Sequence, residues 1–192
     1  MHTDVFIWGK KVSRDFRNKI VKICYELEIE VNWLMACIAF ETGETFSPSI
    51  QNKLSKATGL IQFMPRTAKS LGTTIEELKQ MTAVDQLTWV YKYFKPYKGK
   101  IKSLEDCYMA ILYPAGIGKP PDYAIFTSPS IFYSQNSGLD SNNDGIVTKS
   151  ETCAKIWQKF EKGMRPEYCY ISTEYVIKTK ELADEIRDKS FS

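Results

Sequence analysis

The arrangement of apolar and polar positions predicts two consecutive helices near the start of the chain. The first spans residues 13–28, with Ser13 as its N-cap. Its apolar side chains recur at helical spacing on one face: Phe16, Ile20, Ile23, Cys24 and Leu27. The second spans residues 32–43, with Asn32 as the expected cap and Gly43 as the C-terminal glycine. Because residues 33–40 are apolar nearly all round, we expect this second helix to be buried at the centre of the fold.

The rest of the chain carries signals for further helices. Pro65 fits the first position of a helix that Gly72 ends. Three capping pairs and one apolar pattern predict four more: Thr74 with Glu77, Thr82 with Asp85, Ser103 with Asp106, and residues 172–187. The polar residues 47–56 predict a loop or small hairpin. We therefore expect a mainly α fold, a helical bundle around a buried central helix, in a single domain of residues 1–192.

Glu41 is the main candidate for catalysis. It falls in the last turn of the predicted central helix, where the helix dipole is negative, and Phe40 and Phe46 flank it in sequence. Both the dipole and the apolar neighbours favour the protonated carboxylic acid near neutral pH. A protonated acid of this kind is what cleavage of a glycosidic bond requires, since the leaving oxygen must receive a proton. The alternative is a glutamate at a helix end that simply faces water.

Composition narrows the chemistry further. The only histidine is His2, so Ser-His and Cys-His nucleophilic catalysis lack a base. The net charge of +3 is too small to indicate a nucleic-acid partner. The five cysteines have wide, irregular spacings, which argue against a disulfide framework or a zinc site: Cys24, Cys37, Cys107, Cys153 and Cys169. Carboxylate chemistry with no catalytic cofactor is the remaining expectation.

Two later stretches suit the wall of a cleft. Residues 57–68 form a small-residue turn followed by a compact segment that is apolar and carries an amide, leading into a helix. Residues 113–123 are rich in Gly and Pro, which predicts a stiff loop that presents Tyr113, Lys119 and Tyr123. Aromatic faces beside polar groups suit sugar rings, although a plain connecting loop is the alternative.

Three motifs together resemble the soluble lytic transglycosylases. They are Glu41-Thr-Gly-x-x-Phe-x-Pro, then Ser55-x-Ala-x-Gly-Leu-x-Gln-x-Met-Pro-x-Thr-Ala68, then Tyr113-x-Ala-Gly116, in order within residues 15–125. The resemblance implies a lysozyme-like α+β fold and cleavage of the β-1,4 bond between N-acetylmuramic acid and N-acetylglucosamine in peptidoglycan. It also implies that Glu41 acts first as acid and then as base. The muramyl C6 hydroxyl attacks internally in this family, which gives a 1,6-anhydro product.

The resemblance and the aromatic loop together suggest the residues that line the substrate cleft. We expect these to be Ser55, Ala57, Gly59, Gln62, Phe63, Met64, Tyr113 and Tyr123. Two positions depart from the family pattern, because Pro114 replaces the usual Asn and Lys56 replaces a common Gly. Loss of the Asn removes a polar contact near the reacting sugar, so a hydrolytic muramidase on the same fold is the first alternative. The second alternative is a catalytically silent glycan-binding or virion structural protein stabilised by calcium.

Glu44 is a second carboxylate close to Glu41 in sequence. Many glycosidases use two carboxylates about 5 to 10 Å apart. The family resemblance needs only one, and we expect Glu44 to be a solvated loop residue.

Residues 140–151 match a twelve-residue EF-hand loop at each informative position. The expected calcium ligands are Asp140, Asn142, Asp144, the carbonyl of Ile146, Thr148 directly or through water, and bidentate Glu151. Thr148 and Glu151 also form a capping box for the exit helix, so the EF-hand-like insertion covers about residues 136–162. Residues 127–130 leave little room for an entering helix. We expect a structural ion without a catalytic role; an Asp- and Asn-rich turn without an ion is the alternative.

The ends of the chain and its hydropathy suggest where the protein acts. No apolar run approaches the roughly 18 residues of a membrane span, and residues 1–5 lack a secretory leader. We therefore expect synthesis in the cytoplasm and delivery to the periplasmic cell wall by another route. A bacteriophage endolysin or a virion-associated enzyme, acting as a monomer or as part of a virion, fits this expectation.

Overall fold

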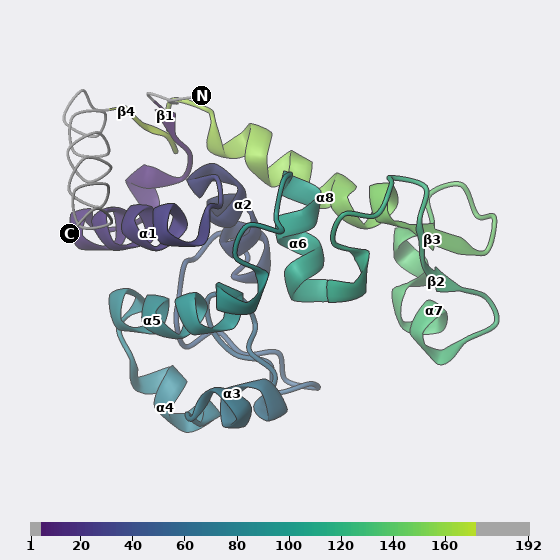
Figure 1. Ribbon diagram of the computed structural model, residues 1–192, viewed down its shortest axis with the longest axis horizontal. Coiled ribbons are helices and arrows are strands. Elements are labelled where there is room, and N and C mark those ends of the chain that lie inside the picture. The colour runs from purple at the N-terminus through teal and green to yellow at the C-terminus, as the bar shows by residue number, and fades with distance from the viewer. Residues whose placement is uncertain (1–4, 172–192) are drawn as a thin grey trace.

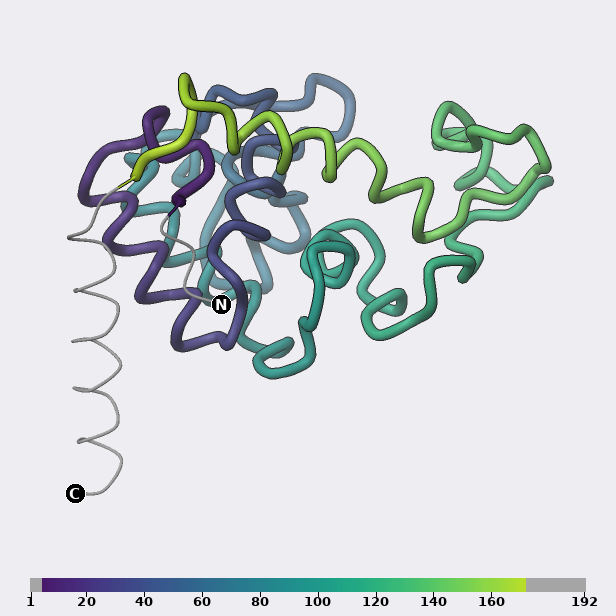
Figure 2. Tube along the Cα trace, turned by 90° about the horizontal axis from the view of Figure 1, so that it is seen from above, coloured from purple at the N-terminus to yellow at the C-terminus, as the bar shows by residue number. Residues whose placement is uncertain are grey.

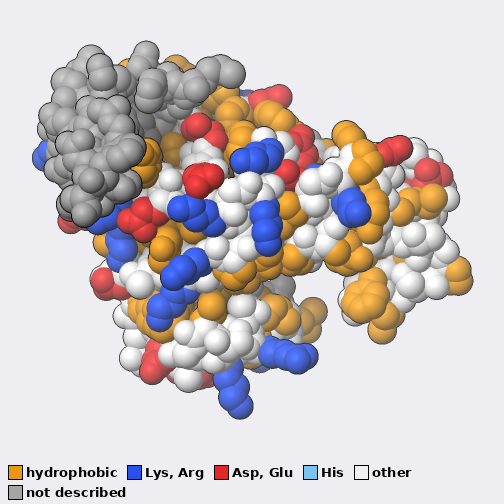
Figure 3. All heavy atoms as spheres, in the orientation of Figure 1, with side chains coloured by type: hydrophobic (Ala, Val, Ile, Leu, Met, Phe, Trp, Pro, Cys, Tyr) orange, Lys and Arg blue, Asp and Glu red, His pale blue; other side chains and the backbone are white. Residues whose placement is uncertain are grey.

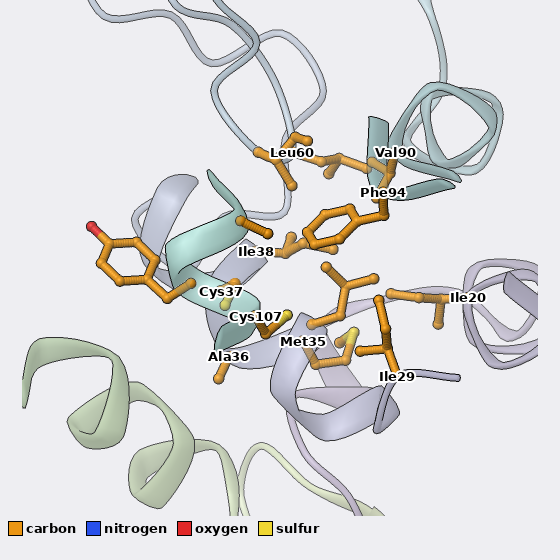
Figure 4. Close-up of a cluster of buried hydrophobic side chains, with 14 of the residues drawn as sticks. Ile20, Ile29, Met35, Ala36, Cys37, Ile38, Leu60, Val90, Phe94 and Cys107 are labelled. Atoms are coloured by element: carbon orange, nitrogen blue, oxygen red, sulfur yellow. The ribbon is translucent and has the colours of Figure 1, made fainter. Parts of the chain in front are cut away.

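The computed structural model describes residues 5–171 and has one buried helix at its centre. Helix α2 (Val31–Glu41) lies between α1 (Arg14–Leu27), α6 (Leu104–Leu112) and α8 (Lys149–Gly163), as Figure 1 shows. Its apolar residues face neighbours on every side, as the sequence predicted. In Figure 4, Met35 and Ile38 of α2 point toward Phe94, while Cys37 lies beside Cys107 of α6.

Local signals account for the helix boundaries. Ser13 caps α1 by accepting a hydrogen bond from the amide of Phe16 at 3.2 Å. The expected cap of α2 was wrong, because α2 begins one residue earlier and Asn32 lies inside it. The Asn32 side chain instead accepts from the amide of Ile7 at 3.1 Å and donates to the carbonyl of Val5 at 2.9 Å. It thus provides hydrogen-bond partners for one amide and one carbonyl group of the neighbouring N-terminal segment.

Three helices form a second group below the central ones in Figure 1. They are α3 (Pro65–Leu71), α4 (Ile75–Gln80) and α5 (Ala83–Phe94). Pro65 occupies the first turn of α3 and Gly72 ends it with a φ of 87°, as predicted. The predicted caps are also present, since Thr74, Thr82 and Ser103 each accept a hydrogen bond from the amide three residues later. We call residues 45–97, which include these helices, the lower lobe.

The two ends of the described chain are joined. Strand β1 (Val5–Phe6) pairs antiparallel with β4 (Tyr170–Ile171). The indole Nε1 of Trp8 donates to the carbonyl of Lys159 at 3.0 Å, and a Cβ on Gly163 would lie 2.5 Å from that nitrogen. Close contact of Trp8 with α8 therefore requires glycine at position 163.

A small third unit extends from the far end of α8, most visibly in Figure 2. It contains β2 (Ala124–Thr127), α7 (Ile131–Asn136) and β3 (Ile146–Thr148), and the two strands pair antiparallel. We call residues 120–148 the distal unit. The EF-hand-like loop begins in the distal unit and ends in the first turn of α8, and only the short α7 precedes it, as the upstream sequence indicated. Its exit helix is α8, which packs on α2 and α6, so the expected insertion shares a helix with the core.

A buried ion pair joins α6, the Gly- and Pro-rich loop and α8. The Lys149 ammonium lies 2.7 Å from the Asp106 carboxylate, with side chains only 5% and 6% exposed. Lys149 also donates to the carbonyl of Lys119 at 2.9 Å, and Asp106 accepts from the amide of Gly118 at 2.8 Å. Burial alone would raise the pKa of Asp106, but hydrogen bonds from Lys149 and from the backbone outweigh it and lower that pKa.

The mainly helical fold class is confirmed, with eight α-helices and four short strands among residues 5–171. All five cysteines are free and buried, so they pack as small apolar residues. The predicted helix at 172–187 and His2 lie outside the described residues. Within residues 5–171, no helix is both long enough and apolar enough to cross a membrane.

We predict that Asp106→Asn lowers the free energy of unfolding by about 3 to 5 kcal/mol, because it leaves Lys149 buried without a counter-charge. The double variant Asp106→Asn with Lys149→Met should recover most of that loss. Urea denaturation monitored by circular dichroism measures both effects. Lys155→Met, an exposed position on α8, is the control and should change stability by less than about 0.5 kcal/mol. A loss in Asp106→Asn no larger than in this control would contradict a stabilising role for the pair.

Candidate functional site

The C-terminal end of α2 is built by the Glu-Thr-Gly motif. The amide of Glu44 donates to the carbonyl of Ala39 at 2.7 Å, and the amide of Gly43 donates to that of Phe40 at 3.1 Å. With Gly43 at a φ of 57°, these bonds form a Schellman motif. The buried Thr42 hydroxyl donates to the carbonyl of Ile38 and accepts from the amide of Phe46. The chain leaving the helix is therefore fixed directly beside Glu41.

Glu41 lies among apolar and aromatic side chains at this helix end. It is half-buried, and desolvation raises its pKa from 4.5 to about 7. Two tyrosines are within electrostatic reach. Burial raises the pKa of Tyr108, and the nearby Glu41 carboxylate raises it further. Burial also raises the pKa of Tyr93, with further contributions from Tyr97 and Glu41. Glu41 is thus mostly a carboxylic acid below about pH 7 and titrates near neutral pH.

The Glu41 carboxylate is left free by its neighbours. Within residues 5–171, no group donates a hydrogen bond to it and no cation pairs with it. In the same range, every fully buried side-chain oxygen or nitrogen has a hydrogen-bond partner. The Glu41 oxygens therefore reach the surface, because they have no such partner. An acid with a raised pKa and an accessible oxygen can deliver a proton to a ligand.

Tyr93 links the two parts of the candidate site, which are the end of α2 and the segment 57–68. Its hydroxyl donates to the carbonyl of Ala110 in α6 at 2.8 Å, which ties α5 to α6. Its ring meets Phe63 edge-on, with centroids 6.1 Å apart. Since Tyr93 is also within electrostatic reach of Glu41, the segment 57–68 and the end of α2 share one region of the molecule.

The turn of residues 57–63 is held by a buried glutamine. Thr58 bridges to Gln51 on one side and to Phe63 on the other, which gives the small hairpin expected next to the site. The Gln86 side chain accepts from the amide of Leu60 at 2.7 Å and donates to the carbonyls of Pro48 and Leu78. A Cβ on Gly59 would lie 2.2 Å from Gln86 Oε1, so this position accepts only glycine.

Left-handed backbone conformations are concentrated around the site. Six residues between 43 and 62 have φ values from 50° to 82°: Gly43, Glu44, Phe46, Lys56, Gly59 and Gln62. Four of these are not glycine, and such positions carry a steric cost that functional sites often retain. Lys56 has a φ of 62°, which explains why a glycine is suitable at the position where this chain departs from the family pattern.

The structure divides the predicted cleft residues into two groups. In the lower lobe, Ser55 and Met64 are exposed, and Gln62 is half-buried with its Nε2 directed to the carbonyl of Gly59 at 3.2 Å. Ala57, Gly59 and Phe63 are buried. The Phe63 side chain is 2% exposed and belongs to the core. The buried residues of this group can shape the wall of the predicted cleft and hold its backbone in place. Their side chains are not exposed to a ligand.

The aromatic residues Tyr113 and Tyr123 lie apart from that group, toward the distal unit. Tyr113 is half-buried and meets Phe126 of β2 with ring centroids 6.2 Å apart. The Lys119 ammonium lies 5.5 Å from the centre of the Tyr123 ring. On the face shown in Figure 3, the surface is hollowed between the lower lobe and the distal unit. The notch therefore lies between the lower lobe, which contains the first group, and the distal unit, which contains Tyr123.

Glu44 is not the solvated residue that the sequence suggested. It accepts hydrogen bonds from Lys159 at 2.5 Å and Lys162 at 2.6 Å, both on α8. Burial opposes ionisation, but the hydrogen bonds from the two ammonium groups outweigh it, so the pKa of Glu44 is lowered. Glu44 is thus an ionised anchor between the end of α2 and α8, and its pKa is shifted in the opposite direction from that of Glu41.

The EF-hand-like loop has the oxygen donors that calcium needs, and its carboxylates are hydrogen-bonded within the loop. Asp140 accepts from the amides of Asp144 and Gly145 at 3.2 and 2.9 Å, and Gly145 has the φ of 84° that the turn needs. Glu151 accepts from Ser141 and Thr148. Burial opposes its ionisation, and these hydrogen bonds lower its pKa to about 2.

The remaining expected ligands are placed in order around this loop. Asn142 is exposed and donates to Asp144 Oδ2 at 2.9 Å, whereas Ile146 begins β3 and Thr148 caps α8. Among residues 5–171, no three Asp, Glu, His or Cys side chains converge as a metal site. The all-oxygen donor set and the order of the ligands fit calcium. The carboxylates, however, are directed to backbone amides within the loop.

Sequence reasoning missed three residues that organise this site: Tyr93, Gln86 and Lys149. Tyr93 lies next to Phe94 in a helix whose inward positions were assigned by spacing, and two adjacent aromatic residues were the available signal. Gln86 and Lys149 are polar residues buried by partners far away in sequence, and no local pattern reveals such partners.

Comparison of the chain with family models, with curated proteins and with solved structures found no significant match. The assignment of a function therefore depends on the residues and their geometry.

We predict that Glu41→Gln stabilises the protein more at pH 8 than at pH 4. In the wild type the raised pKa means that the folded state holds a proton more tightly than the unfolded state. The stability that this tighter proton binding contributes is fully present below pH 4.5 and is lost as the pH rises through about 7. The difference between variant and wild type should grow by at most about 3 kcal/mol, less where solvent reaches the carboxylate. Urea titrations at the two pH values measure it, and an equal difference at both would contradict the raised pKa.

Proposed function

We propose that this protein is a peptidoglycan-degrading enzyme in which Glu41 acts as the general acid and base for glycan-strand cleavage. The observation that carries the proposal is the half-buried, unpaired Glu41 with a pKa of about 7, at the end of the central helix. The similarity of the Glu41, 55–68 and 113–116 motifs to soluble lytic transglycosylases supplies the substrate class. A mainly helical fold around a buried helix is compatible with a lysozyme-like domain, which is part of the proposal.

The chemistry follows from the state of the two carboxyl groups. Glu41 in its protonated form donates a proton to the glycosidic oxygen as the C1–O4 bond breaks. The resulting Glu41 carboxylate then takes the proton of the muramyl C6 hydroxyl as that oxygen bonds to C1, which closes the 1,6-anhydro ring. Glu44 remains ionised and paired with Lys159 and Lys162, so it is not free to attack the sugar or to activate water. One carboxyl group therefore performs both proton transfers.

A hydrolytic muramidase is the second candidate. The observation that favours it is Pro114, which begins a 3₁₀ turn where the family carries an Asn. Proline provides no side-chain hydrogen bond, so the reacting sugar loses one polar contact that helps exclude water. In this version Glu41 activates a water molecule in the second step, and every other part of the proposal is unchanged.

The delivery route belongs to the proposal as well. We propose that the protein is a bacteriophage enzyme that either lyses the host cell or opens the host cell wall from the virion.

We further propose that residues 140–151 bind calcium as a structural ion. Asp140, Asn142, Asp144, the carbonyl of Ile146, Thr148 and Glu151 would hold it. Since α8 begins at this loop and packs on α2, an ion here would stabilise the start of a core helix. Calcium supplies no step of the reaction.

Glu41→Gln should reduce clearing of purified cell walls at least about 100-fold, because the amide keeps the shape of the side chain but cannot donate the catalytic proton. Turbidity of a wall suspension at pH 6 measures the rate. Glu44→Gln is the matched control. It should lose stability with its two ion pairs yet keep more than about a third of the wild-type rate below its melting temperature. Full activity in Glu41→Gln would refute Glu41 as the acid, and an inactive wild type would favour a silent binding protein.

For the metal, calorimetric titration with calcium should give binding heat in the wild type and none in Glu151→Gln. Glutamine can keep the capping box with Thr148, so α8 remains capped without the ion, but its NH2 group cannot accept the hydrogen bonds from Ser141. The metal-free variant should therefore melt somewhat below the metal-free wild type. Calcium should raise the melting temperature only in the wild type. Equal heat in both proteins would contradict binding by this loop.

A further inference from the structure

The lower lobe carries an unbalanced positive charge beside the proposed cleft. Residues 45–75 contain four basic residues and no Asp or Glu: Lys53, Lys56, Arg66 and Lys69. The other 22 basic and 23 acidic residues of the chain leave a net charge of −1, so this one segment accounts for the positive charge of the whole protein. We call these four side chains the basic rim.

The basic rim is placed by ordered backbone. Lys53 and Lys56 lie on the turn of residues 52–56, where the Asn52 side chain accepts from the amides of Leu54 and Ser55 at 2.9 and 3.1 Å. The amide of Lys56 also donates back to the carbonyl of Asn52 at 2.9 Å. These hydrogen bonds therefore fix the backbone from which the side chains of Lys53 and Lys56 extend, before any ligand binds.

The other two members of the basic rim stand on α3. Arg66 and Lys69 are three residues apart, which places them on the same face of the helix. Figure 3 shows Lys and Arg side chains projecting from the lower end of the molecule, where the lower lobe lies. All four members are exposed, and none forms an ion pair with a carboxylate of residues 5–171. Their charge is thus available to an external anion.

We propose that the basic rim binds the carboxylates of peptidoglycan stem peptides while the glycan strand occupies the notch. This inference rests on the proposed function. The 57–68 segment that would line the glycan cleft contains Arg66 and is flanked directly by Lys56 and Lys69, so anions attached to the muramic acid would pass close to the rim. The sugars cleaved by Glu41 are neutral along the strand, whereas the stem peptides carry free carboxylates. A surface of four uncompensated cations attracts such groups and raises the rate of productive encounter.

The test uses the variant Lys53→Gln, Lys56→Gln, Arg66→Gln and Lys69→Gln in the full chain. On intact walls at low ionic strength, we expect kcat/KM to fall roughly tenfold, mainly through KM. On walls whose stem-peptide carboxylates have been converted to neutral amides with a carbodiimide and ammonia, the variant should match the wild type. At about 0.5 M salt the difference on intact walls should disappear, because exposed charges are then screened.

A matched control changes the same charge elsewhere. Lys11, Lys22, Lys100 and Lys155 are exposed outside the lower lobe, and their combined replacement by Gln should leave kcat/KM on intact walls within about twofold of the wild type. An equal loss in this control would overturn the inference, since net charge alone would then explain the effect. An equal loss on the walls with amidated carboxylates would also overturn it.

Binding without turnover separates this inference from the proposed function. In a Glu41→Gln background, co-sedimentation with insoluble walls should fall when the basic rim is replaced, whether or not the parent protein is active. Walls stripped of phosphodiester polymers by hydrofluoric acid should show the same fall. If stripping abolishes it, the anions are phosphates of an attached polymer and the stem-peptide assignment is wrong.

Discussion

Burial of α2 is the constraint on which the rest of the structure depends. A helix that is apolar on all sides needs neighbours on all sides, and α1, α6, α8 and the lower lobe supply them. The same burial places Glu41 at the boundary between the core and the surface. Desolvation raises its pKa to about 7, while its oxygens stay accessible. The feature that stabilises the fold is therefore also the one that prepares the carboxyl group for proton transfer.

Two carboxyl groups three residues apart show how the surroundings determine chemistry. Among residues 5–171 no cation pairs with Glu41, and desolvation raises its pKa to about 7. Glu44, just beyond the Schellman motif, is ionised by Lys159 and Lys162. The motif glycine makes this division possible, because its left-handed conformation turns the chain away from the helix axis. One group is thus suited to act on a ligand and the other to join α2 to α8.

Sequence patterns predicted the local features well. The limits of α1, the Gly43 ending of α2, Pro65 in the first turn of α3 and the capping pairs all follow from short-range rules. Asn32 was the exception, because its side chain is used by backbone groups 25 and 27 residues away. The pKa of Glu41 was predicted in direction from its apolar neighbours. The lysozyme-like fold and the calcium site stay predictions.

Long-range polar contacts could not be read from the sequence. Gln86 holds the turn of residues 57–63, and Lys149 reaches Asp106 across 43 positions. Tyr93 joins α5 to α6 beside Glu41. Each depends on which helices meet, and that depends on the packing of the whole chain. The absence of acidic residues from 45 to 75 could be read from the sequence. The position of this segment in the lower lobe, beside the notch, could be known only from the structure.

The most direct measurement of the central claim is the mass of the soluble muropeptides that the purified protein releases from cell walls. Cleavage by Glu41 through internal attack of the C6 hydroxyl predicts products ending in 1,6-anhydro-muramic acid, and no such products from Glu41→Gln. Products heavier by one water would show hydrolysis by the same residue. Release of neither product by the wild-type protein, or of the same products by Glu41→Gln, would contradict the account.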